Sequence, residues 1–91
     1  MIDDTTKNEA EVRLKKVEGQ IRGISKMVHD EKYCIDIIHQ ISAAEKALDK
    51  VAKIIMKRHI ESCVQEAIRS GDPDQKVDEL IKTVFKLSDR H

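Results

Sequence analysis

Apolar residues recur along three stretches of the chain at intervals of three or four residues. In the first stretch, residues 8–29, they stand at Leu14, Val17, Ile21, Ile24 and Val28. In the second, residues 33–70, they stand at Ile37, Ile41, Ala44, Leu48, Val51 and Ile55. In the third, residues 73–88, they stand at Val77, Leu80, Ile81, Val84 and Leu87. This spacing is typical of helices that bury one stripe against a neighbour. The sequence therefore predicts three helices over about these ranges.

The polar segment between the second and third stretches contains residues typical of a helix end and a helix start. Gly71 suits the end of one helix, Asp72 the N-cap of the next, and Pro73 its first position. Three Gly, one Pro, one Phe and one Tyr among 91 residues argue against a turn-rich β fold. We therefore predict an all-α protein in which residues 1–91 form a single domain.

The predicted second helix is long for a chain of this size. At 1.5 Å per residue it spans about 55 Å, more than the width of a globule of 91 residues. A second copy of the chain is the simplest cover for its apolar stripe, so we expect an oligomer. No apolar run approaches the ~20 residues that cross a bilayer, and the N-terminus does not resemble a signal peptide. We therefore expect no membrane partner and a cytoplasmic location, where thiols stay reduced.

A histidine and a cysteine four residues apart are the clearest sign of chemistry. His59 and Cys63 would project from the same side of the second helix. Cys34, the other cysteine, would lie about 43 Å away on a straight helix. If two copies of this helix pack antiparallel and cross near residues 47 and 48, Cys34 of one copy lies opposite residues 59–63 of the other. Each of the two equivalent sites would then combine Cys34 with the His59 and Cys63 of the partner copy.

Two thiolates and one imidazole form a soft donor set. Three such ligands suit Cu(I) better than the closed four-ligand sites of structural zinc, although zinc with an added water is an alternative. A second alternative has no metal: both cysteines are small buried apolar residues and His59 is an ordinary surface residue.

The charges balance overall but not locally. The chain has 17 basic and 17 acidic residues, and residues 7–58 hold twelve basic and eight acidic ones, a net charge of +4. Residues 59–91 carry a net charge of −2. Such an asymmetry is typical of a solvated surface in a monomer, but repeated copies in an oligomer would form a wide basic surface.

Three segments resemble a known family, the CsoR/RcnR/FrmR repressors that respond to copper, nickel or formaldehyde. The segments are RLKKVEGQIRGI (13–24), DEKYCIDIIHQISAAEKAL (30–48) and HIESC (59–63). The resemblance implies a three-helix protomer that forms an antiparallel four-helix-bundle dimer and then a dimer-of-dimers tetramer. It also implies transcription regulation: a repressor that binds operator DNA in the apo form and is released when the metal binds.

The ligand pattern is closest to the copper(I)-sensing branch. The resemblance implies Cys34, His59 and Cys63 as Cu(I) ligands, with Tyr33 and Glu79 hydrogen-bonding around the histidine. Nickel sensors place a histidine at the position of Cys63, formaldehyde sensors lack the second cysteine, and persulfide sensors lack the histidine. These three branches are the alternatives within the family.

The resemblance also implies a DNA-binding surface, made of Arg13, Lys15, Lys16, Arg22, Lys50 and Lys53. Four copies in a tetramer would neutralise phosphates and make the affinity sensitive to salt. Two other classes of protein are alternatives. A thiol enzyme would use Cys34 as nucleophile and His59 as base, but the sequence supplies no oxyanion stabiliser, so we predict no enzyme. A copper buffer, binding metal but not DNA, would need the ligands without the basic surface.

Overall fold

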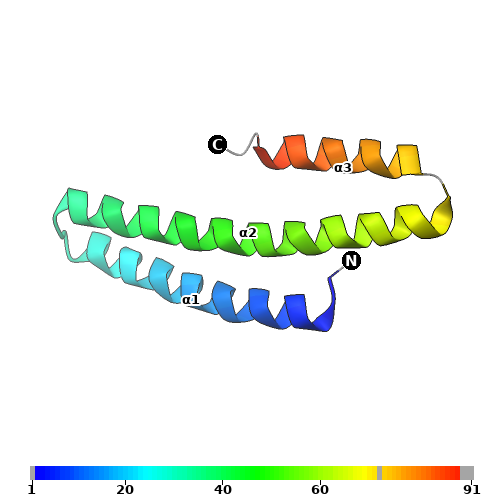
Figure 1. The fold of residues 1–91 in the computed structure, drawn as a ribbon. Coiled ribbons are helices and arrows are strands. Elements are labelled where there is room, and N and C mark those ends of the chain that lie inside the picture. Colours follow the sequence, from blue (N-terminus) through cyan, green and yellow to red (C-terminus); the bar gives the residue numbers. More distant parts are fainter. Residues whose placement is uncertain (1, 72, 89–91) are drawn as a thin grey trace. The chain divides into compact units, whose positions relative to one another are not determined.

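The computed structural model describes residues 2–71 and 73–88, which form three α-helices (Figure 1). The helices are α1 (Asp4–His29), α2 (Cys34–Ser70) and α3 (Pro73–Ser88). No strand occurs in these two described ranges. The expected N-cap at Asp72 and the side chain of Leu87 lie outside what the structure describes. The prediction of an all-α chain with three helices is confirmed.

α1 begins at Asp4, one turn before the predicted start at residue 8. Asp3 caps this end, since its carboxylate accepts a hydrogen bond from the Thr6 amide at 2.8 Å. The cap satisfies an amide that has no partner within the helix. The first turns bury Thr6 and Ala10, which are too polar or too small to register in a pattern of large apolar residues. The predicted start was wrong for this reason.

The turn from α1 to α2 is a Schellman motif. The Lys32 amide donates to the Met27 carbonyl at 3.0 Å, and the Glu31 amide donates to the Val28 carbonyl at 3.1 Å. Glu31 stands in the left-handed position of the motif with φ 55°, where glycine is usual. α2 then begins at Cys34, and the Tyr33 carbonyl accepts from the Ile37 amide at 3.2 Å to close the first turn.

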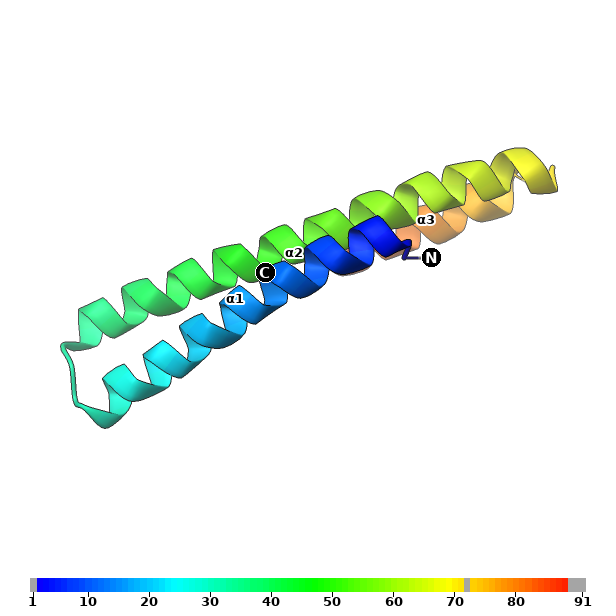
Figure 2. The same cartoon turned by 90° about the horizontal axis from the view of Figure 1, so that it is seen from below.

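The chain divides into two compact units, and α2 contributes to both. The first unit comprises residues 2–55, in which α1 runs back along the first part of α2 (Figure 2). Its buried apolar side chains are Ala10, Val17, Ala44 and Val51. Two other positions of the α2 stripe, Ile41 and Leu48, keep 40% and 41% of their surface exposed. The first unit therefore covers only part of the stripe.

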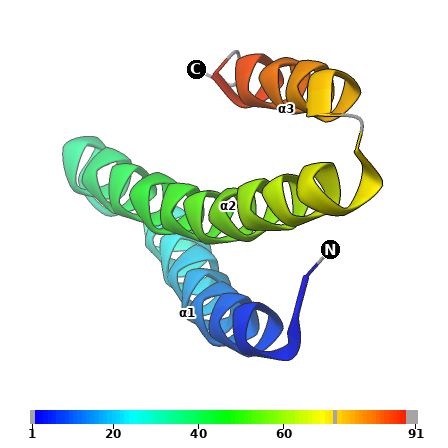
Figure 3. The same ribbon diagram turned by 45° about the vertical axis from the view of Figure 1, so that its right-hand side comes forward.

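The second unit contains the described residues from Met56 onward. In it α3 runs back along the last turns of α2, after a turn at Gly71 with φ 71° (Figure 3). A small cleft in this unit is lined by Val64 and Ala67 of α2 and by Val77 and Leu80 of α3, among other residues. Within the described ranges, no helix has both the length and the hydropathy of a membrane span.

Candidate metal centre

His59 and Cys63 lie one turn apart on α2, and their side chains meet. The Cys63 Sγ atom is 3.4 Å from the Nε2 atom of His59, and both residues are half-buried. The hydrogen bond between them is donated by the thiol or by the ring N–H, depending on the tautomer. The predicted pair is thus brought together in the second unit, as the four-residue spacing requires.

The two donor atoms are spaced as ligands of one metal ion would be. With metal–sulfur and metal–nitrogen bonds of about 2.3 and 2.0 Å, the donors stand about 3.5 Å apart at a tetrahedral angle and about 3.7 Å apart at a trigonal angle. The observed 3.4 Å is close to both values. A thiolate and an imidazole are also the donors that soft metals such as Cu(I) prefer. The pair therefore fits a metal site, and a metal ion would replace the shared proton.

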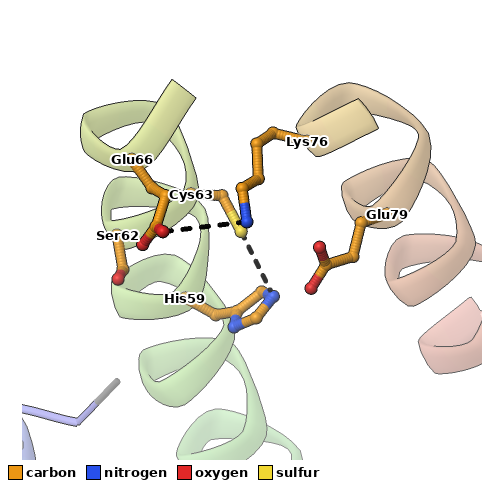
Figure 4. A pocket seen from close by; sticks show the side chains of 6 residues that line it. All are labelled: His59, Ser62, Cys63, Glu66, Lys76 and Glu79. Atoms are coloured by element: carbon orange, nitrogen blue, oxygen red, sulfur yellow. Dashed lines mark hydrogen bonds and ion pairs between the residues drawn. The ribbon is translucent and has the colours of Figure 1, made fainter. Parts of the chain in front are cut away.

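A pocket of about 170 Å³ surrounds the pair within the second unit (Figure 4). α2 supplies its wall from one side of the helix, with His59, Ser62, Cys63 and Glu66, and α3 supplies Lys76 and Glu79. The Lys76 Nζ atom lies 3.8 Å from an oxygen of Glu66, which joins the two helices. Figure 4 shows the Glu79 carboxylate pointing across the pocket toward the ring of His59. Glu79 is therefore in a position to contact a metal-bound imidazole.

The other two residues predicted at the site belong to the first unit. Cys34 is the first residue of α2 and is exposed as a free thiol. Tyr33 precedes it and keeps 68% of its surface exposed. Among the described residues, no group of three or more His, Cys, Asp or Glu side chains forms a metal-binding cluster. One chain thus brings together two of the three predicted ligands.

The six basic residues predicted to contact DNA all lie in the first unit. Five of them are exposed: Lys15, Lys16, Arg22, Lys50 and Lys53. Arg13 is half-buried and its Nε atom lies 3.6 Å from an oxygen of Glu9. Arg22 forms a similar pair with Glu18 at 3.7 Å. Both pairs follow the i, i+4 spacing on α1, so the sequence contained the signal for them.

Sequence reasoning missed three residues of the pocket. Ser62 stands three residues after His59, and Glu66 stands three residues after Cys63. This helical spacing already placed both residues beside the pair. Lys76 had no such signal, because its place depends on how the turn at Gly71 returns α3 along α2.

Known proteins resemble this chain in sequence and in fold. Residues 6–86 match the model of a family described as metal-sensitive transcriptional repressor. The chain is 49% identical over 74 residues to the copper-sensing transcriptional repressor CsoR of Bacillus subtilis (strain 168), an alignment that covers 81% of this chain and 72% of that protein.

Two solved structures are also similar. The copper-sensing repressor CsoR with Cu(I) from Geobacillus thermodenitrificans NG80-2 matches with a TM-score of 0.82 and 40% identity, over 97% of this chain and 92% of that chain. The nickel-responsive transcriptional regulator InrS matches with a TM-score of 0.80 and 32% identity, over 87% of this chain and 89% of that one. The resemblance stated from the three sequence segments is confirmed, and the chain belongs to the metal-sensitive transcriptional repressor family.

Proposed function

We propose that this repressor senses copper: the apo form binds operator DNA, and Cu(I) binding releases it. The observation that carries the proposal is the His59–Cys63 pair, in which the Sγ and Nε2 atoms lie 3.4 Å apart. Its thiolate donor favours a soft monovalent ion over harder divalent ions. Relatives named as copper-sensing repressors support the same choice. Membership of a repressor family agrees with the prediction that the chain is not an enzyme.

A nickel sensor is the second candidate, because the nickel-responsive regulator InrS has a similar structure. The thiol of Cys63 argues against this candidate. Ni(II) competes well at sites rich in nitrogen and oxygen, whereas thiolates select Cu(I).

We place the third ligand, Cys34, on a partner subunit. An antiparallel pair of α2 helices that crosses near residues 47 and 48 would bring the partner's Cys34 to the His59–Cys63 pair. The exposed apolar surface near this crossing supports the arrangement. A groove of about 300 Å³ in the first unit is lined by Glu45 and by six apolar residues: Val17, Ile21, Ile24, Ile41, Ala44 and Leu48. A second copy of the chain would fill this groove and complete a four-helix bundle.

The basic surface of the first unit would contact the operator. α1 supplies Arg13, Lys15, Lys16 and Arg22, and α2 supplies Lys50 and Lys53. A dimer of dimers would present four copies, and their phosphate contacts would supply affinity that falls with salt. DNA and reduced thiols both favour the cytoplasm as the location.

Anaerobic titration of the reduced protein with Cu(I), while operator binding is followed by fluorescence anisotropy, tests the function. We expect release of DNA at one equivalent of Cu(I) per protomer, and no release by Ni(II) at the same concentration. Release by Ni(II) alone would favour the nickel sensor. Tight Cu(I) binding without an effect on DNA would indicate a copper buffer.

A mixture of two variants tests the shared site. Neither a Cys34→Ala homodimer nor a His59→Ala/Cys63→Ala homodimer has a complete site. In the heterodimer, one site receives Cys34 from the second chain and both remaining ligands from the first. We therefore expect one tight Cu(I) per heterodimer, measured by competition with a chelator on a tagged and purified heterodimer. A heterodimer that binds no better than the homodimers would contradict the antiparallel arrangement.

A further inference from the structure

Lys76 stands at an unusual place for a cation. It is the fourth residue of α3, where the partial positive charge of the helix N-terminus disfavours a positive side chain. It also lines the same pocket as Cys63, and Figure 4 shows its side chain among those around the His59–Cys63 pair, with a dashed line from its ammonium group to Glu66. The Lys76 side chain keeps only 28% of its surface exposed. Glu66 offsets part of the cost, since its carboxylate lies 3.8 Å from the Lys76 Nζ atom.

The charges of the pocket bear on which ion it accepts. The six residues that line it include one cation, Lys76, and two carboxylates, Glu66 and Glu79. In the proposed site, two thiolates and a neutral imidazole around a monovalent ion make a centre of net charge −1. The same ligands around a divalent ion make a neutral centre. The two carboxylates therefore repel the centre that holds the monovalent ion, with its charge of −1, more than the neutral centre that holds a divalent ion. A cation in the pocket attracts the centre of charge −1 more than the neutral one.

We infer that Lys76 is a specificity-determining residue, which biases the His59–Cys63 site toward monovalent Cu(I) and away from divalent ions. This inference rests on the proposed function. Charges outside the pocket, including any from the partner subunit, are the same in a variant and in the wild type, so they cancel when the two are compared. The effect of Lys76 thus lies in the ratio of Cu(I) affinity to divalent-ion affinity.

Two variants that change the charge of the pocket in opposite directions test this ratio of Cu(I) affinity to divalent-ion affinity. Lys76→Met removes the cation and should lower the Cu(I) affinity about fivefold, while Co(II) affinity stays within about twofold, as expected for a partly exposed charge pair. Glu66→Gln removes a carboxylate and should shift the ratio the other way. Lys76→Arg keeps the charge and should restore the wild-type ratio. Lys82→Met, on an exposed residue of α3 outside the pocket, is the matched control.

The measurements use the full-length reduced protein under anaerobic conditions. Cu(I) affinity is measured by competition with a colorimetric chelator, and Co(II) affinity by the thiolate charge-transfer band of the bound ion. Opposite shifts for Lys76→Met and Glu66→Gln support the inference. An unchanged ratio in both variants would overturn it, and so would an equal loss of both affinities, which would indicate that Lys76 only holds α3 to α2. Failure of the wild type to bind Cu(I) would instead refute the proposed function itself.

Discussion

Arg13 offers a measurable test of the proposed DNA surface. Its Nε atom lies 3.6 Å from Glu9, and the two side chains keep 41% and 49% of their surface exposed. Such an exposed pair contributes about 0.2–1 kcal/mol, so the guanidinium can leave Glu9 for a phosphate at small cost. Each phosphate contact contributes about 0.9 to the slope of log affinity against log salt concentration. Between 50 and 200 mM salt this amounts to about 3.5-fold in affinity for each contact.

We therefore expect Arg13→Ala to weaken operator binding and to flatten its salt dependence, with Cu(I) affinity unchanged. The slope should fall by about 1.8 if two copies of Arg13 contact phosphates and by about 3.6 if four copies do. The change in slope thus counts the contacts. Glu9→Gln, which removes a carboxylate that competes for Arg13, should raise the affinity about 1.4- to 5-fold for each copy of Arg13 that contacts a phosphate.

The assay is operator binding by fluorescence anisotropy at four salt concentrations, with Arg69→Ala as the control. Arg69 is an exposed arginine of the second unit and is not part of the proposed surface. If Arg13→Ala keeps the wild-type affinity and slope at matched salt, Arg13 does not contact DNA. An equal effect of Arg69→Ala would show a general loss of charge rather than a local contact.

Two further variants test the turn between α1 and α2 and the role of His59 in the release of DNA. Glu31→Gly should raise the free energy of unfolding by about 0.5 kcal/mol, because φ is 55° at this position and glycine adopts this angle without strain. Urea denaturation at fixed protein concentration measures this change, and a loss of stability would argue against the Schellman turn. His59→Ala should keep tight Cu(I) binding through the two remaining thiolates but lose Cu(I)-induced release of DNA. Chelator competition and anisotropy on one sample check this, and normal release would refute a role of the imidazole in signalling.

The helices could be predicted from the sequence because large apolar residues recur at helical spacing. The pattern located the start of α2 to within one residue and the end of α3, and the residues Gly71 and Pro73 located the end of α2 and the start of α3. It failed at the start of α1, where the buried residues are Thr6 and Ala10 and the Asp3 cap decides the boundary. Capping depends on one side chain and one amide, so a periodic pattern does not detect it.

The candidate site was predictable only where it lies on one helix. The spacing of four residues placed His59 beside Cys63, and the structure gives the 3.4 Å contact. The pocket that surrounds them also requires α3, and the position of Lys76 and Glu79 follows from the turn at Gly71 rather than from any spacing. The sequence alone could not show that a cation lines the same pocket as the thiol.

The division of the chain into two units suggests why a ligand from a partner would serve a sensor. The His59–Cys63 pair belongs to the second unit, and both Cys34 and the six basic residues belong to the first. A site complete within the second unit could bind a metal without any consequence for the basic residues. A site that needs the partner's Cys34 instead ties the second unit of one protomer to the first unit of the other, where the DNA contacts are proposed. In this proposed arrangement metal binding would favour one arrangement of the protomers, and a bias of only ~1–3 kcal/mol would change DNA affinity about 5- to 150-fold. In the proposed site, a Cys34 supplied by the partner would therefore couple metal binding to DNA binding, as a sensor requires and a copper buffer does not.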